Sequence, residues 1–460
     1  MFAKKSTLIV LLCAIALGAG VYYFDWIKGN EKKPDADASK PVFTSLQASD
    51  VTSLTISHPA QPALPALKLE KQGADWRITQ PVATEADQPT AAGLVDQIAF
   101  LRVSQTEPGS ADRRKAYGLD PAQLSIEFQL ANGAKHSILL GNADFTNDNV
   151  YAIVDGAQNV SLLPQLLTTT AGKSLDDLRD RAVLHLSVDQ VNSIDLKNSS
   201  GEIAIAKDSS KDGSGWKIQK PEAVSAGHDA VDSLLQAVSN AKTVSVASET
   251  ADKLAQFGLA PPAITFSAAD AKGATQTLIV GKKDGNAFYA RDTSRPTIFR
   301  IDSDLETKLA QKFGDLRDKQ ILHADVGSST RLEVQTAAGS FTLVRKPTDP
   351  DEWQFDAPAD RKGKVAASWK VLDPLGSMQA DEVIDHPTAA QLAQLSQPAV
   401  RITLTGKDGK VLNLRVSKLT GDTAYAQVDG DSALYKIKKS VFDQVNVSAA
   451  DLEAGNVTLQ

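Results

Sequence analysis

The sequence predicts an α+β protein of tandem repeats, each an antiparallel sheet with helices on one face, preceded by one N-terminal transmembrane helix. Three observations lead to this prediction. An apolar segment opens the chain, residue markers recur at fixed spacing, and strand patterns with two-residue alternation enclose helical patterns in each recurrence. The expected boundaries are 1–25 for the membrane segment, 26–45 for a linker, and 46–184, 185–325 and 326–460 for three repeats, the last of them divergent.

The N-terminal segment is predicted to be an uncleaved signal anchor. Two lysines precede an uncharged run from Ser6 to Phe24, which is long enough to cross a bilayer as a helix. A cleaved signal peptide is the alternative, but no small-residue cleavage site followed by a polar start is visible. Lipid attachment at Cys13 is disfavoured because Leu12 stands where a small residue is needed. The lysines before the span place the N-terminus in the cytoplasm and the bulk of the chain in the periplasm, at a bacterial inner membrane.

Small residues recur within this predicted span. Ala14 with Gly18, and Ala16 with Gly20, form small-xxx-small pairs that would let another helix approach closely. The alternative is that alanine and glycine are simply common in membrane anchors. The residues that follow, up to about 45, are rich in Lys, Asp, Pro and Ser and are expected to form a linker between the membrane and the first repeat.

Composition excludes two classes of protein. A formal net charge of −7 over 460 residues argues against a nucleic-acid-binding surface. Cys13 is the only cysteine, so the residues after the predicted span can form no disulfide. The length instead allows about three domains, each with its own core.

The first recurring marker is a tryptophan strand that ends at a proline. Tryptophan and the apolar residue two positions later share one face of a strand, and proline then ends the strand because it cannot donate to the ladder. We interpret these tryptophans as core residues, in preference to a sugar-stacking surface. The markers, five residues apart in each repeat, are Trp76 and Pro81, Trp216 and Pro221, and Trp353 and Pro358.

The second group of markers begins at a helix stop of the form Gly-Leu-x-Pro, in which glycine takes the left-handed conformation. The third repeat has Gln394-Leu395 and Pro398 instead, so its cap must be closed differently. Strands ending in glycine, a Tyr-Ala pair and a Leu-Arg-Asp segment follow the helix stop. These markers are Gly118, Leu119, Pro121, Gly141, Tyr151 and Asp180; Gly258, Leu259, Pro261, Gly281, Tyr289 and Asp318; and Tyr425.

Each unit is therefore expected to contain strands, a helix, a short helix, strands and a closing helix over about 140 residues. We expect a four-strand antiparallel meander covered by helices, which can bury a core at this size. The constant spacing indicates duplication, since the Trp-to-Gly distance is 42 residues in the first two copies (118−76 and 258−216).

This set of markers resembles the DUF4340 family, a domain of unknown function. The resemblance covers residues 46–325 well and 326–460 weakly. It implies a single-span envelope protein of the kind encoded beside ABC transporter components of the gliding-motility-like auxiliary type. An ABC permease and its auxiliary subunits are the protein partners that it implies. The family supplies no catalytic residues that could be assigned here.

The sequence carries no recognisable catalytic motif. A phosphate loop and a dinucleotide-binding glycine pattern are both missing, so no nucleotide or other cofactor is expected. No two of the six histidines have metal-ligand spacing, and Gly213-Ser214-Gly215 lies in a polar hairpin instead of a nucleophile elbow. The acidic loop around Asp144 and Asp148 is interpreted as a solvated turn in preference to a weak calcium site. We therefore expect no enzymatic activity and no bound metal.

The Leu-Arg-Asp segments leave two interpretations open. Asp180 lies between Arg179 and Arg181, and Asp318 between Arg317 and Lys319. These charges could bind an anionic ligand or a partner protein, or they could form a salt bridge at a helix end that ties neighbouring repeats together; the second interpretation is favoured. His185 and His323 each follow the aspartate by five residues and are interpreted as a repeated structural position.

Three functions remain possible from the sequence. The favoured one is a non-enzymatic, membrane-anchored periplasmic accessory protein associated with an ABC transporter. A stand-alone lipid- or glycan-binding envelope module is the alternative, and it would need a deep cleft. An unrecognised hydrolase is the second alternative, and it would need polar groups that converge on one pocket.

Overall fold

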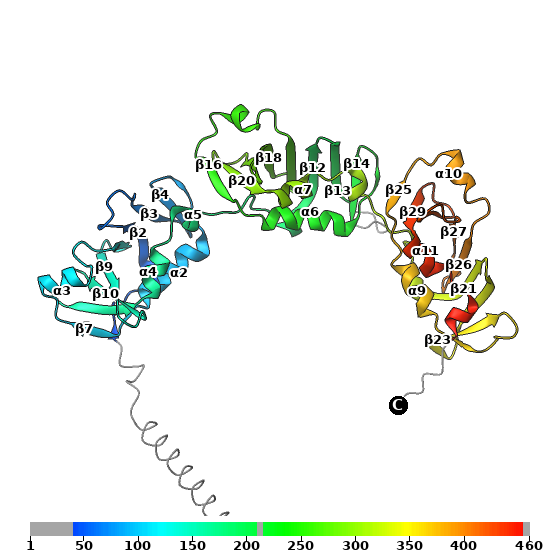
Figure 1. Cartoon of the computed structure of the whole chain (residues 1–460), viewed down its shortest axis with the longest axis horizontal. Helices are drawn as coiled ribbons and strands as arrows, with labels where there is room; N and C mark the ends of the chain where they lie inside the picture. The colour runs from blue at the N-terminus through cyan, green and yellow to red at the C-terminus, as the bar shows by residue number, and fades with distance from the viewer. Residues whose placement is uncertain (1–39, 209–214, 454–460) are drawn as a thin grey trace, which may run out of the picture. The chain divides into compact units, whose positions relative to one another are not determined.

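The computed structural model describes residues 40–208 and 215–453 (Figure 1). These residues form three nine-stranded antiparallel sheets and one two-stranded pair. The chain divides into two compact units, residues 1–181 and 182–460, and each is described by itself. The first unit contains one nine-stranded sheet and the second contains two, so tandem repetition and the α+β class are both confirmed.

The first repeat has the strand order β5-β4-β3-β2-β8-β9-β10-β11-β7. Its strands are β2 (Val51–Ser57), β3 (Leu67–Gln72), β4 (Asp75–Gln80), β5 (Thr84–Glu85), β7 (Gln105–Glu107), β8 (Leu124–Leu130), β9 (Lys135–Ala143), β10 (Asn149–Val154) and β11 (Val160–Pro164). The separate pair is β1 (Lys40–Pro41) with β6 (Arg102–Val103). Its helices are η2 (Ala48–Asp50), α2 (Gln88–Ala99), α3 (Ala111–Ala116), α4 (Leu166–Ala171) and α5 (Leu175–Leu178).

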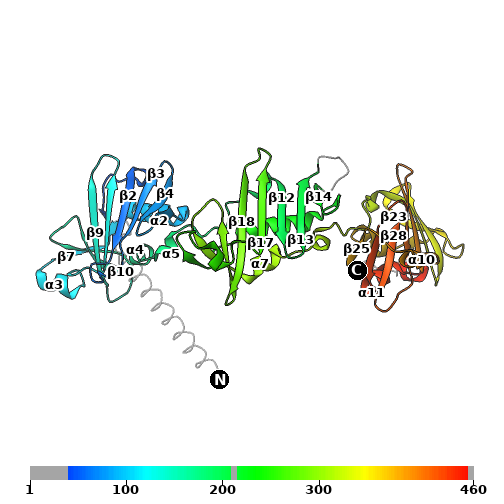
Figure 2. The same ribbon diagram turned by 90° about the horizontal axis from the view of Figure 1, so that it is seen from above.

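The second repeat has the same strand order, with neighbouring strands side by side as Figure 2 shows for β12, β13 and β14. Its strands are β12 (Val191–Asn198), β13 (Gly201–Lys207), β14 (Trp216–Lys220), β15 (Val224–Ser225), β16 (Ser245–Ser248), β17 (Ile264–Asp270), β18 (Thr275–Asp284), β19 (Ala287–Asp292) and β20 (Ile298–Asp302). Its helices are η3 (Val188–Gln190), α6 (His228–Asn240), η4 (Leu254–Phe257), α7 (Ser303–Leu309) and α8 (Phe313–Leu316).

The third repeat keeps the same strand order again. Its strands are β21 (Ser329–Thr336), β22 (Gly339–Lys346), β23 (Asp349–Ala357), β24 (Val365–Ala366), β25 (Glu382–Ile384), β26 (Val400–Gly406), β27 (Val411–Val416), β28 (Thr423–Val428) and β29 (Leu434–Lys438). Its helices are η5 (Val326–Ser328), α9 (Trp369–Gly376), α10 (Ala389–Ala393), α11 (Lys439–Val445) and η6 (Ala449–Leu452).

The expected four-strand meander was wrong in extent, because each sheet has nine strands. The additional strands are short edge segments. β5 and β15 have two residues each and β7 has three, which is too few to show a two-residue alternation in the sequence. These short strands come before and after the long helix of each repeat, and there the main chain lies against the two edges of the sheet.

One core fills the space between each sheet and its helices. In the first repeat the apolar stripe of α2, including Leu94 and Ile98, packs with Leu54 and Ile126 of the sheet. This helix begins where the Asp87 side chain accepts a hydrogen bond from the N–H of Thr90. The second and third repeats have equivalent cores around α6 and α9.

The three tryptophans belong to these cores. Trp76, Trp216 and Trp353 are 5%, 4% and 3% exposed, so the interpretation as core residues is confirmed and a stacking surface is ruled out at these positions. The prolines that follow them end their strands, and the peptide bonds before these prolines are cis.

The Gly-Leu markers close the short helices as expected. Gly118 and Gly258 have φ angles of 69° and 70°, in the left-handed region that favours glycine. The next residue, Leu119 or Leu259, is buried. In the third repeat Gln394 keeps a right-handed helical conformation, and the carbonyl of Ala393 accepts hydrogen bonds from Ser396. The prediction of a different cap is therefore confirmed.

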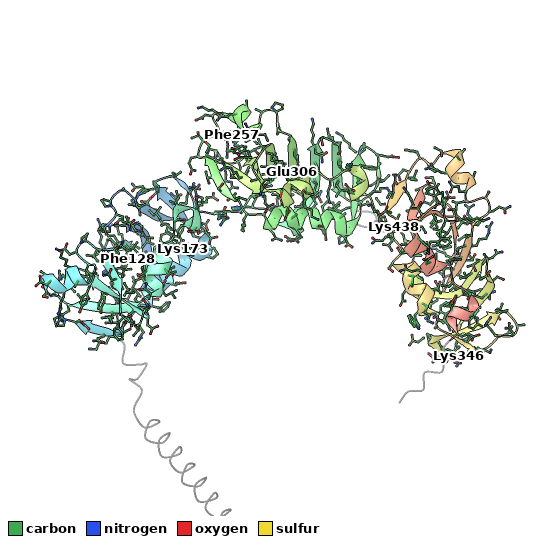
Figure 3. The ribbon with its side chains drawn as sticks, viewed as in Figure 1. Phe128, Lys173, Phe257, Glu306, Lys346 and Lys438 are labelled. Carbon is green, nitrogen blue, oxygen red and sulfur yellow. The ribbon has the colours of Figure 1, made fainter. Side chains whose placement is uncertain are left out.

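In the first two repeats the strand-ending glycine and the tyrosine of the Tyr-Ala pair lie against the Gly-Leu stop. A Cβ atom at Gly141 would lie 2.1 Å from the carbonyl oxygen of Tyr117, and one at Gly281 would lie 2.2 Å from that of Phe257 (labelled in Figure 3). The Tyr117 ring stacks on Tyr151 with the ring centroids 3.8 Å apart. The glycine that ends each strand is thus needed because the helix end lies directly on it.

In the second repeat this corner also contains an ion pair. Arg300 Nε lies 2.6 Å from Asp284 Oδ2, and the guanidinium lies over the Tyr289 ring. The hydrogen bond from Arg300, with a further one from Tyr289, lowers the pKa of the Asp284 carboxyl.

The lowered pKa of Asp284 predicts a pH-dependent stability. A carboxyl whose pKa is lower in the folded state stabilises the protein above its unfolded pKa, and this contribution is lost as pH falls through the folded pKa. We expect wild type to be more stable than Asp284→Asn at neutral pH, with a difference that disappears on acidification. Urea unfolding of both proteins across that range measures the difference; a difference independent of pH contradicts the prediction.

No helix within residues 40–208 and 215–453 is both long and apolar enough to cross a membrane. The predicted anchor and its small-xxx-small pairs, Ala14 with Gly18 and Ala16 with Gly20, lie outside the described residues.

Candidate functional site

The Leu-Arg-Asp segment is the recurring marker that carries charged side chains. Its backbone is hydrogen-bonded to the chain at the edge of the sheet, and we call this segment the strap. In the second unit the N–H of Gly227 donates to the carbonyl of Leu316 at 2.9 Å, and the N–H of Asp318 donates to that of Ser225 at 3.0 Å. The segment thus runs antiparallel to the chain that links β15 to α6. Leu316 is fully buried and holds the strap against the core.

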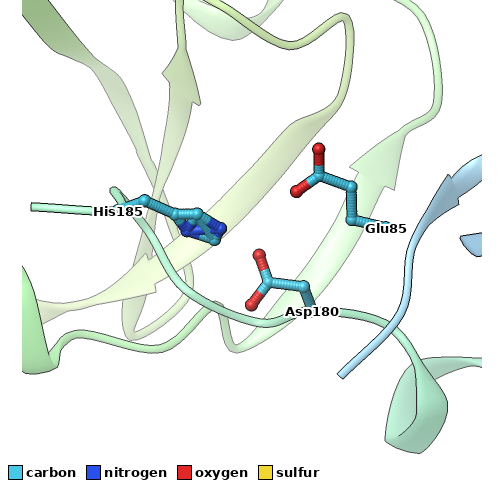
Figure 4. Close-up of side chains that lie close together, drawn as sticks. All are labelled: Glu85, Asp180 and His185. Atoms are coloured by element: carbon cyan, nitrogen blue, oxygen red, sulfur yellow. The ribbon is translucent and has the colours of Figure 1, made fainter. Parts of the chain in front are cut away.

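The same strap occurs in the other repeats. In the first unit Asp87 donates to the carbonyl of Leu178, and Asp180 donates to that of Glu85. Figure 4 shows the side chains of Glu85 and Asp180; His185, also labelled there, belongs to the second unit. In the third repeat Ala367 donates to the carbonyl of Leu452. The Leu position therefore has a backbone role that all three repeats share.

Arg317 links the strap of the second repeat to the third repeat. Its Nη2 lies 2.9 Å from Asp385 Oδ1, and the two side chains are only 13% and 14% exposed. Its Nη1 also donates to the carbonyls of Ser225 and Asp318. Each of these contacts uses a donor that an anionic ligand would otherwise need.

The main chain after the strap continues into the third repeat. The N–H of Ile321 donates to the carbonyl of Met378 at 3.0 Å, and the N–H of Ala380 donates to that of Lys319 at 2.8 Å. The ion pair from Arg317 to Asp385 therefore lies beside a hydrogen-bonded connection between the two repeats. Tyr435 lies in the same surroundings, and burial, followed by its hydrogen bond to Asp431, raises the pKa of its hydroxyl.

Asp318 and His323 form a weaker pair. Asp318 accepts a hydrogen bond from the N–H of Gln320, and its second oxygen lies 3.6 Å from His323 Nε2. The equivalent histidine, His185, is anchored differently, because its carbonyl accepts a hydrogen bond from Gln276. Within the described part of the second unit, no three His, Cys, Asp or Glu side chains come close enough to hold one metal ion.

A polar recess of about 560 Å³ lies next to Arg317 and Asp318. His228, Asp229, Lys319 and His323 are among the side chains that line it, and none of its lining residues is serine, threonine or cysteine. The recess can bind a small polar or charged group, but it offers no hydroxyl or thiol nucleophile.

The acidic loop of the first repeat is a structured turn. The Asp144 carboxylate is buried and accepts hydrogen bonds from Thr146 and Asn149. These bonds, with that from Asn149 the largest cause, lower the pKa of its carboxyl. Its oxygen atoms are occupied by the loop itself.

Sequence reasoning missed Asp385, the partner of Arg317. The sequence does contain a pattern that points to Asp385. Glu249 and Asp385 each stand ten positions before the leucine that follows the short helix, Leu259 and Leu395 (259−249 and 395−385). Comparison of acidic positions between repeats, in addition to apolar and glycine positions, would have found it.

Comparison with known proteins assigns the chain to a family. A family model described as a domain of unknown function, DUF4340, matches residues 76–214 and 216–398, which together make up more than half of the chain. The two matched segments begin at Trp76 and Trp216, 140 residues apart (216−76). Neither a search of curated proteins nor one of solved structures found a match.

Proposed function

Since this chain belongs to the DUF4340 family, whose description assigns no function, we propose from its own residues that it is a non-enzymatic, membrane-anchored periplasmic accessory protein of an ABC transporter. The observation that carries the proposal is that the residues that recur in the repeats have structural roles. Tryptophans fill cores, glycines admit helix ends, and the Leu-Arg-Asp segment straps the sheet edge. The repeats therefore share the residues that build the fold.

The side chains on the open sheet faces support this proposal. In the first repeat a recess of about 610 Å³ is lined by charged and polar groups, among them Glu127, Lys135 and Asp155. Strand pairing places Ser267, Thr275 and Thr293 at the corresponding points of the second repeat. The same pairing places Asp195 of the second repeat where the first has Thr55. The two repeats therefore carry their charges at different positions of this face, as expected for surfaces with different partners on a common scaffold.

The predicted anchor supports the membrane part of the proposal, and the family resemblance supports the transporter as partner. The uncharged run from Ser6 to Phe24 would fix the repeats beside other membrane subunits. Proteins that this chain resembles look like single-span envelope proteins encoded beside ABC transporter components.

The proposal predicts both a location and a complex. Asn132, in the exposed turn before β9, can be changed to cysteine in a Cys13→Ser background. A membrane-impermeant maleimide should label this cysteine in spheroplasts without lysis, and the chain should co-purify in mild detergent with the permease of the neighbouring transporter. Labelling only after lysis contradicts the location. Recovery as a free chain, while permease and ATPase stay together, contradicts the partner.

A glycan-binding role is the second candidate, and one observation favours it. Trp369, at the start of α9, is 62% exposed and lines a recess of about 510 Å³ together with Arg345, Asp351 and Asp373. An exposed indole next to carboxylates and a guanidinium can stack on a sugar ring and bind its hydroxyls. Loss of glycan binding in Trp369→Ala, with unchanged co-purification, would separate this role from the first.

A further inference from the structure

Among the described residues of the first repeat, four large apolar side chains are exposed to solvent: Leu64, at 47%, and three that are more exposed. Phe100, Phe145 and Leu166 are 79%, 95% and 64% exposed. They come from three separate segments: the end of α2, the loop between β9 and β10, and the start of α4. Single exposed apolar residues are ordinary, but three at one edge indicate a contact surface. We call them the apolar edge.

Strand register brings these three segments to the same edge of the first repeat. Gln105 pairs with Leu162, and the N–H of Ser104 donates to the carbonyl of Leu162, so the chain going back toward Phe100 runs alongside the chain going forward to Leu166. The N–H of Gln165 donates to the carbonyl of Asp148, which places the loop of Phe145 beside Leu166. The Ser104 hydroxyl donates to the side-chain oxygen of Asn149, the residue of β10 that follows this loop.

The second repeat provides an internal comparison. Leu94 and Ile98 of α2 correspond to Leu234 and Val238 of α6, 140 residues later, so Phe100 corresponds to Asn240. By the same reasoning Leu167 corresponds to Leu305, which aligns Leu166 with Asp304. The loop of Phe145 is shortened to Gly285 and Asn286.

The third repeat is polar at two of these points, the end of the long helix and the start of the closing helix. Ser377 follows α9 where Phe100 follows α2, and Ser440 lies in the first turn of α11 where Leu166 lies in that of α4. A fold that needed apolar residues at this edge would have them in every repeat. The apolar edge is therefore a property of the first repeat and is not required by the fold.

The first repeat differs from the others in being next to the predicted anchor. Lys40 and Pro41 pair with Val103 and Arg102, three and two residues after Phe100, so the described chain starts beside the segment that follows Phe100. Fifteen residues, 25–39, lie between Lys40 and Phe24, which ends the uncharged run of the predicted span. Even fully extended, a chain of that length reaches at most about 55 Å, which keeps the edge within reach of the bilayer.

We propose that the apolar edge of the first repeat inserts into the interface of the phospholipid bilayer beside the anchor. Phenylalanine and leucine favour the boundary between headgroups and acyl chains, and the exposed Lys40 and Arg102 suit anionic headgroups. Asp148 is an exposed acid in the loop of Phe145 and would remain at the headgroup level. The contact would fix how the first repeat faces the membrane. This inference rests on the anchor of the proposed function.

The test uses the full chain, in a Cys13→Ser background, in vesicles of phosphatidylethanolamine and phosphatidylglycerol. An environment-sensitive fluorophore is attached at Asp148→Cys, or at Asn286→Cys in the corresponding loop of the second repeat as the matched control. Lipids with a nitroxide near the headgroup should reduce the fluorescence at 148 about twofold and leave that at 286 unchanged. The substitutions Phe100→Asn, Phe145→Gly and Leu166→Asp together should abolish the quenching without changing the thermal unfolding.

Vesicle flotation separates the two proposals. A chain that does not float with the vesicles overturns the anchor, and this inference with it. A chain that floats but shows no quenching at 148, or equal quenching at 286, overturns only the inference. If the fluorophore at 148 reports an apolar environment only after transporter subunits are added, the apolar edge binds a protein, and the inference is overturned. Quenching at 148 that persists in the triple variant also overturns the inference.

Discussion

Gly281→Ala is expected to destabilise the second unit by about 3 kcal/mol, because the new methyl group meets main chain that cannot move aside. The added Cβ would lie 2.2 Å from the carbonyl oxygen of Phe257 and 3.0 Å from the carbonyl of Gly258. Both carbonyls belong to the end of η4, which the left-handed Gly258 holds in place. Relief of the clash requires the helix end to move off the sheet, which would expose Leu259.

Gly314→Ala is the matched control for this prediction. Gly314 lies in α8 of the same repeat, and a Cβ there would meet no atom within 4 Å, so stability should change by less than about 0.5 kcal/mol. Urea unfolding followed by tryptophan fluorescence measures both variants against wild type. Equal stabilities for the two variants would mean that the helix end does not lie on Gly281.

Loss of the ion pair between Arg317 and Asp385 is expected to have an effect of similar size. Arg317→Met leaves the mostly buried Asp385 carboxylate without its guanidinium and removes donors from the carbonyls of Ser225 and Asp318. Breaking a buried pair from one side costs about 3 kcal/mol. Asp385→Leu should cost a similar amount, because the Arg317 charge is then the one without its partner.

The double variant tests whether the two residues act together. Arg317→Met with Asp385→Leu leaves no unpaired charge, so its cost should be smaller than the sum of the single costs by about 2 kcal/mol. Lys220→Met is the control, because it breaks an ion pair with Glu202 of equal length, 2.9 Å, that is exposed to solvent. That change should cost much less than either change at the Arg317 and Asp385 pair, because solvent screens the exposed charges. Additive single effects would show that Arg317 and Asp385 do not interact in solution.

Of the residues in these two predictions, Gly281 and Arg317 were noted in the sequence, whereas Asp385 was not. Gly281 was visible as a marker because its distance from Gly258, 23 residues, equals that between Gly118 and Gly141. The sequence did not show why glycine is needed there. The close approach of the Phe257 carbonyl comes from two segments that meet only in the folded repeat.

Asp385 shows the opposite case. Arg317 was noted in the sequence as part of Leu-Arg-Asp, but its partner lies 68 residues later (385−317), after β25. No local pattern connects two charges at that distance, because an ion pair needs no periodicity. The short edge strands were missed for a related reason: two or three residues enter a sheet because a neighbour offers a free edge, and their own sequence carries no alternation.

By itself the sequence determined that the chain repeats one α+β unit of about 140 residues and that tryptophan, glycine and leucine markers recur within it. These are local properties, set by side-chain periodicity and by the few residues that can end a helix or a strand. The tertiary structure decided what the markers contact, which charge Arg317 meets, and that Phe100, Phe145 and Leu166 share one edge. Strand register and the packing of helix ends on the sheet bring together residues that are distant in sequence, and both follow from the fold of the whole repeat.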